Sequence, residues 1–169
     1  SIVPPVQFPP SDFSVTGARL SVLWGNHRDM YGVDLGLIGN VTEQTFVGVG
    51  LSGLFNKTKG QTTIIGLQGA LGWNYNVQKT DVFGLQFAAV NINVASSSVN
   101  GVQFGLANIS DHTVIRGAQV GIYNKAQEVY GLQIGIINMA TNLHGIQIGL
   151  LNFHDKGMFK VSPIINIGF

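Results

Sequence analysis

Residues 131–153 read GLQIGIINMATNLHGIQIGLLNF and give nearly the same phrase twice. The stretch GLQIGIIN, residues 131–138, returns fourteen residues later as GIQIGLLN, residues 145–152. Within each copy, bulky aliphatic residues alternate with glycine and glutamine. Alternation with a period of two is typical of a β-strand whose two faces meet different surroundings. What each of these two faces meets decides the fold.

The same phrase recurs, with variation, along almost the whole chain. A degenerate copy, SPIINIGF, closes the chain at residues 162–169. The earlier copies begin, at spacings of 14 to 18 residues, at Gly17, Gly32, Gly48, Gly66, Gly84, Gly101 and Gly117. This array predicts a single all-β repeat domain over residues 12–169, with short polar turns between strands and no helix.

The composition restricts the function classes that the chain can belong to. Charged residues make up only 10% of the 169 residues, against about a quarter in an ordinary soluble domain. The formal net charge is +1 and the basic residues are scattered, so no nucleic-acid partner is expected. The chain has no cysteine, which excludes disulfides and thiolate metal sites. No cofactor and no metal are expected.

Alternation divides every copy into a small polar face and an apolar face. The polar face carries Arg19 and Asp34 in the early copies and a row of glutamines afterwards. These glutamines are Gln68, Gln86, Gln103, Gln119, Gln133 and Gln147. In the two best copies, the apolar face consists of Leu132, Ile134, Ile136, Ile146, Ile148 and Leu150.

The pattern favours a small antiparallel transmembrane β-barrel of about ten strands, one for each repeat of 14–18 residues. Its apolar face would contact membrane lipid over roughly 20–25 Å, close to the ~25 Å apolar band of such barrels. The residues Leu132, Ile134, Ile136, Ile146, Ile148 and Leu150 would then face lipid. Arg19, Asp34 and the glutamine row would line the lumen, where Arg19 and Asp34 are close enough to pair.

A parallel β-solenoid is the alternative fold. In this arrangement the aliphatic face would point inward and the glutamines would stack on the outside. Four asparagines would form an inward ladder at a turn: Asn108, Asn124, Asn138 and Asn152. A repeat that consists of one strand and one turn favours the solenoid, whereas glycine on a water-exposed face disfavours it.

The last residues of the chain favour the barrel. Phe169 is preceded at alternate positions by Ile167 and Ile165. This arrangement resembles the C-terminal strand signature of bacterial outer-membrane β-barrels, although Pro163 departs from the pattern. The GxQxGxxN repeat is also similar to short-repeat outer-surface proteins of Gram-negative bacteria. These resemblances imply a bacterial outer-membrane or cell-surface location, with Phe169, Ile167 and Ile165 as an assembly signal for the barrel assembly machinery.

Residues 1–11, SIVPPVQFPPS, predict an extended proline-rich arm. Proline removes backbone donors and presets an extended conformation, which lowers the entropy lost on docking. Val3, Val6 and Phe8 are apolar and are therefore expected to dock, either inside the barrel lumen as a plug or on other outer-membrane or surface proteins.

No catalytic set emerges from the sequence. His27, His112 and His154 each have a carboxylate nearby, but polar turn chemistry explains them. The sequence therefore predicts a non-enzymatic structural or accessory subunit of a membrane assembly. A narrow passive pore and a soluble surface solenoid for adhesion or binding are the alternatives.

Overall fold

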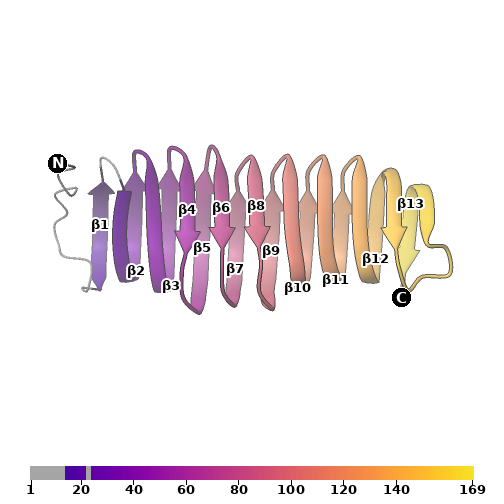
Figure 1. The fold of residues 1–169 in the computed structure, drawn as a ribbon, viewed down its shortest axis with the longest axis horizontal. Helices are drawn as coiled ribbons and strands as arrows, with labels where there is room; N and C mark the ends of the chain where they lie inside the picture. Colours follow the sequence, from indigo (N-terminus) through magenta and orange to yellow (C-terminus); the bar gives the residue numbers. More distant parts are fainter. Residues whose placement is uncertain (1–13, 22–23) are drawn as a thin grey trace.

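Each copy of the repeat pairs in parallel and in register with the next copy. Gln86 pairs with Gln103, Gln103 with Gln119, and Gln119 with Gln133. A chain that returns to the same side after every repeat winds into a coil. The protein, seen here as a computed structural model that describes residues 14–21 and 24–169, is accordingly a parallel β-solenoid of about eight turns. Its strands stack side by side along a rod (Figure 1).

The described part of the chain contains thirteen strands and no helix. They are β1 (Val15–Ser21), β2 (Trp24–Gly36), β3 (Gly39–Ser52), β4 (Phe55–Thr58), β5 (Thr62–Ala70), β6 (Trp73–Asn76), β7 (Thr80–Phe87), β8 (Val90–Asn93), β9 (Ser97–Phe104), β10 (Ala107–Val120), β11 (Tyr123–Ile134), β12 (Ile137–His154) and β13 (Val161–Gly168).

Each turn of the solenoid contributes one segment to each of two walls. The glutamine wall is built from the GxQxG segments, for example β5, β7 and β9. The asparagine wall is built from the shorter segments β4, β6 and β8. Long strands take part in both walls, since residues 107–110 of β10 pair with β8 and residues 113–120 pair with β9. A tight turn therefore leads from the glutamine wall to the asparagine wall, and a wider bend leads back.

The predicted antiparallel barrel is wrong. The repeats pair in parallel, and the antiparallel pairing among the described strands is that of β12 with β13. The physical reason lies in the identical polar side chains of successive repeats. Parallel in-register stacking puts each glutamine beside the next one, which lets their amides bond. Antiparallel hairpins would place equivalent residues of neighbouring repeats at different heights of the sheet.

The alternative fold is confirmed, but its assignment of the faces was incorrect. The glutamines from Gln86 to Gln147 are fully buried, whereas aliphatic neighbours such as Ile134 and Ile148 point outward. The barrel prediction also placed the Gly/Gln face inside. The structure differs in that this face lies in the packed interior of a solenoid and does not line a lumen. The expected inward asparagine ladder is present, and it extends from Asn40 to Asn152.

A ladder of amide hydrogen bonds holds the glutamine wall together. Each Nε2 donates to Oε1 of the glutamine one turn earlier, at 2.7–2.9 Å, from Gln147 back to Gln68. Asn166 of β13 continues the ladder by donating to Gln147 at 3.1 Å. Buried polar groups are tolerated when they are fully hydrogen-bonded, so the ladder makes a polar interior stable.

A second ladder runs through the asparagine wall in the opposite direction. Each Nδ2 donates to Oδ1 of the asparagine one turn later, as Asn108 does to Asn124 at 2.8 Å. The same Nδ2 also donates to a backbone carbonyl of the glutamine wall, for example Asn108 to the Val120 oxygen at 3.1 Å. Each asparagine therefore stabilises the tight turn through hydrogen bonds and links the two walls.

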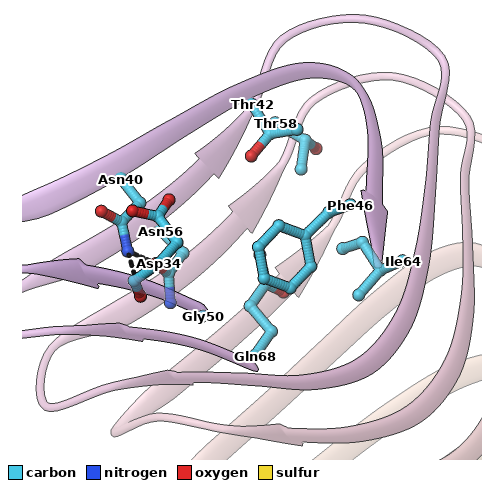
Figure 2. A pocket seen from close by; sticks show the side chains of 9 residues that line it. All are labelled: Asp34, Asn40, Thr42, Phe46, Gly50, Asn56, Thr58, Ile64 and Gln68. Carbon is cyan, nitrogen blue, oxygen red and sulfur yellow. Dashed lines mark hydrogen bonds between the residues drawn. The ribbon is translucent and has the colours of Figure 1, made fainter. Parts of the chain in front are cut away.

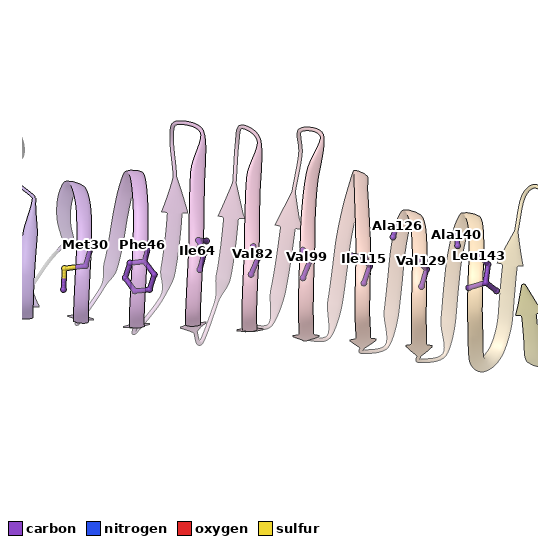
Figure 3. Close-up of a cluster of buried hydrophobic side chains, with 10 residues drawn as sticks. All are labelled: Met30, Phe46, Ile64, Val82, Val99, Ile115, Ala126, Val129, Ala140 and Leu143. Atoms are coloured by element: carbon purple, nitrogen blue, oxygen red, sulfur yellow. The ribbon is translucent and has the colours of Figure 1, made fainter. Parts of the chain in front are cut away.

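A narrow apolar row completes the interior between the ladders and the wide bends (Figure 3). One larger side chain per turn stacks on the next, and Ala126 and Ala140 add a small side chain in two of the turns. The cluster consists of Met30, Phe46, Ile64, Val82, Val99, Ile115, Ala126, Val129, Ala140 and Leu143. The apolar core is thus a single file of side chains, and the bulk of the interior is polar.

Glycine is required within the strands of the glutamine wall. The first glycine of every described repeat has a φ between +117° and +154°, a region that side-chain-bearing residues rarely adopt. At Gly117, a Cβ atom would overlap the carbonyl oxygen of Gly101 in the preceding turn. The stacked glycines therefore let successive turns approach closely at this point of the wall.

Strand β13 covers the C-terminal end of the rod. It runs antiparallel to β12, so that Ile165 pairs with Ile148 and Ile167 with Ile146. Ile165, Ile167 and Phe169 are exposed, and Ile164 has a φ of +68°. The final strand thus closes a solenoid, whereas the resemblance implied a closing barrel strand. The reading of these residues by an assembly machinery stays a prediction.

Candidate functional site

The outer surface of the glutamine wall is apolar from one end of the rod to the other. Two rows of side chains, on either side of each buried glutamine, point outward, and none of them is polar in the described turns. The rows are Ala18, Val33, Val49, Leu67, Leu85, Val102, Ala118, Leu132 and Ile146, and Leu20, Leu35, Leu51, Phe87, Phe104, Val120, Ile134 and Ile148. Gly69 holds the position between Leu51 and Phe87 in the second row, and the Phe87 ring lies against it. We call this surface the apolar face.

The tight turns extend the apolar face as a ridge along one edge of the rod. Leu71 and Leu150 are 78% and 67% exposed there. The other members of the ridge are Leu37, Leu54, Leu106, Ile122 and Ile136. An ordinary monomer exposes a largest apolar patch of roughly 300–600 Å². Two rows and a ridge form a continuous apolar surface, unlike the isolated hydrophobic side chains that an ordinary protein surface carries.

Aromatic and basic side chains border the apolar face toward the wide bends. Tyr130 and His144 stack with their ring centroids 4.5 Å apart, and the Arg116 guanidinium lies 5.8 Å from the Tyr130 ring. Tyr31 and Phe83 occupy the same row in earlier turns and are about half exposed. This border is where the surface changes from apolar to polar.

The wide bends form the polar edge of the rod. Lys125 and Asp111 form an ion pair of 2.7 Å between neighbouring turns. The hydrogen bond to Asp111 raises the pKa of Lys125, although partial burial acts in the opposite direction. Exposed Lys59, Gln61 and Gln127 lie along the same edge. The surface of the rod therefore changes from the apolar ridge at the tight turns to a polar edge at the wide bends.

A buried ion pair replaces the glutamine ladder near the N-terminal end. Arg19 Nε and Nη2 donate to the two carboxylate oxygens of Asp34 at 2.8 and 2.6 Å. Both side chains are almost completely buried. Burial raises the pKa of the Asp34 carboxyl, and the hydrogen bond and charge of Arg19 oppose this rise. The pair that the sequence suggested thus forms, within a packed interior, and its two charges compensate each other.

A small cavity lies where the ladder is interrupted (Figure 2). Gly50 stands at the glutamine position, and the Phe46 ring occupies part of the space that a longer side chain would fill. The remaining cavity measures about 10 Å³ and is also lined by Asp34, Asn40 and Gln68. That volume holds about one water molecule and is too small for an organic ligand. The cavity is therefore a packing feature of the interior.

The predicted site residues fall into distinct groups. Arg19, Asp34 and the six glutamines form one interior column. Leu132, Ile134, Ile136, Ile146, Ile148 and Leu150 lie together on the apolar face and its ridge, and contact with lipid stays a prediction. Val3, Val6 and Phe8 of the arm lie outside the described residues.

Sequence reasoning missed half of the asparagine ladder and the polar row beside it. Asn40, Asn56, Asn74 and Asn91 are buried and bonded like the four that were predicted. In the next inward row, Thr58 donates to Asn76, Asn76 to Asn93, and Asn93 to Ser110. Their spacing, equal to that of the glutamines, is the signal that would have revealed them.

Within residues 14–21 and 24–169, no group of acidic or histidine side chains is arranged to hold a metal ion. In the same part of the chain, no helix has the length and apolarity needed to cross a membrane. The chain matches no family model, no curated protein and no solved structure.

Proposed function

We propose that this chain is a non-catalytic assembly module, a rigid rod that binds through its apolar face. The observation that carries the proposal is the continuity of that face over all the described turns of the glutamine wall. Exposed apolar patches of this extent mark surfaces that are covered in the working state. The ladders beneath the face fix its geometry, so little side-chain or backbone order is lost on binding.

The proposal keeps the structural or accessory role expected from the sequence and assigns it to a solenoid. Adhesion through the same face is the second candidate, because a flat regular surface also suits an extended target. A passive pore requires the lumen of a barrel, so we do not propose this function for a packed solenoid. Location at a bacterial outer membrane or cell surface, with lipid or other surface proteins as partners, stays a prediction.

Cysteine accessibility in producing cells tests the proposal, since the chain has no cysteine of its own. Leu85 on the apolar face and Val94 at the polar edge are both 42% exposed, so they form a matched pair. Leu85→Cys is expected to react with a water-soluble maleimide at least tenfold more slowly than Val94→Cys in the cells that naturally make the protein. The difference should vanish after denaturation. Equal rates in native cells would contradict the proposal.

A further inference from the structure

The apolar face has the size and regularity of a self-association surface. Successive glycines of the described repeats, from Gly17 to Gly145, are paired turn by turn. At ~4.8 Å per turn the face is about 40 Å long, and the two rows with the ridge make it about 18 Å wide. We propose that two copies of the chain pack with their apolar faces together, an inference that rests on the proposed function.

The area of the face meets what a stable dimer needs. A face of about 40 by 18 Å presents roughly 700 Å², so two copies would bury about 1,400 Å² in total. Specific interfaces bury about 1,200–2,000 Å². A partner that contacted only a few turns would leave most of the face in water.

The spacing of the turns favours a second copy over an unrelated partner. Side chains on the apolar face repeat every ~4.8 Å along the rod. A second copy has the same repeat, so its rows can enter the gaps between turns along the whole length, as in paired cross-β sheets. An irregular globular surface matches this spacing only locally.

The charge distribution agrees with self-association. The two rows of the apolar face contain no charged side chain in the described turns, so two identical faces meet without like-charge repulsion. Arg116, Asp81 and Glu128 lie outside these rows, toward the wide bends. The outer surface of the asparagine wall carries Lys57 and Lys125, which makes it a poorer self-association surface. Face-to-face packing about a two-fold axis therefore stops at two copies.

Light scattering on purified full-length protein, without detergent, tests the dimer. The native protein is expected to have twice the 18.0 kDa mass of one chain. The double variant Leu85→Arg/Phe104→Arg is expected to have the mass of a monomer and to keep the circular dichroism spectrum of β-strands. The dimer Kd of the double variant should rise at least a hundredfold. Val94→Arg should leave the mass and the Kd unchanged.

Two further outcomes separate this inference from the proposed function. If the double variant does not fold, purified Leu85→Cys should still react more slowly than Val94→Cys at high concentration, and equally fast on dilution below the Kd. The dimer hypothesis is overturned if the native protein has the mass of a monomer. This holds whether the monomer is free or is bound to detergent micelles or phosphatidylglycerol vesicles. If Leu85→Cys is nevertheless protected in cells, the assembly module stands with another partner; if it is reactive there, both fail.

Discussion

A Gly117→Ala variant is expected to lower the free energy of unfolding by about 2–6 kcal/mol. Gly117 has a φ of +143°, and a Cβ atom there would overlap the carbonyl oxygen of Gly101. The strained φ costs about 1–3 kcal/mol, and forcing extra volume into a packed site costs a further 1–3 kcal/mol. Neither term can relax easily, because turns on both sides hold this glycine in register. Urea unfolding followed by circular dichroism measures the loss.

Gly105→Ala is the matched control for this prediction. Gly105 has no positive φ, and the equivalent positions of earlier turns already hold Ala70 and Ala88. A Cβ atom there would lie 2.7 Å from the Ala88 carbonyl oxygen, so the backbone must shift, but the contact is longer than at Gly117 and no strained φ adds to it; a cost smaller than that at Gly117 is expected. A loss at Gly105 equal to that at Gly117 would contradict the role assigned to the positive-φ glycines.

Gln119→Glu should destabilise the protein by about 3–4 kcal/mol at pH 7, since it buries a charge without a cation. Gln119 Nε2 donates to Gln103 at 2.9 Å, while its Oε1 accepts from Gln133 at 2.7 Å. An ionised carboxylate cannot donate, so its second oxygen would face the Gln103 oxygen with no hydrogen between them. A protonated carboxyl has one donor and one acceptor, and restores both bonds.

The pH dependence of this variant follows from the sign of the expected shift. Burial raises the pKa of the new carboxyl in the folded state above its unfolded value of about 4.3. The penalty is therefore absent below about pH 4 and grows as the pH rises toward the folded-state pKa. Unfolding curves at pH 4 and pH 7, each compared with the unchanged protein, measure it. Gln127→Glu, at an exposed position of the polar edge, should show little pH-dependent loss.

The sequence contained enough to predict strands, repeats and which residues share a face. Period-two alternation correctly separated Gln133 from Ile134, and equal spacing located the ladder from Asn108 to Asn152. Alternation does not show what an outward isoleucine contacts. The same sequence pattern arises whether that face contacts lipid, a protein partner or water. The aliphatic outer rows therefore suggested lipid and, with it, a barrel.

The topology was missed because its signals are geometric. The positive φ of Gly117 and its close approach to Gly101 belong to the stacking of each turn on the one before it. A glycine in a sequence does not state which conformation it adopts. Identical glutamines at identical repeat positions were the available clue, since amide ladders require parallel in-register neighbours. The ion pair of Arg19 with Asp34 was predictable because both occupy the glutamine position in adjacent repeats.

Distances between spin labels on the asparagine wall test the solenoid most directly. Lys57 and Met139 are five paired turns apart, and Asn26 is two turns further from Met139 than Lys57 is. At ~4.8 Å per turn, pulsed electron resonance on labelled cysteine pairs should give about 24 Å for 57–139 and about 34 Å for 26–139. Dilution with unlabelled protein restricts the signal to single chains. A 26–139 distance shorter than the 57–139 distance would mean that the first and last strands come back together, as in a closed barrel, and would contradict the rod.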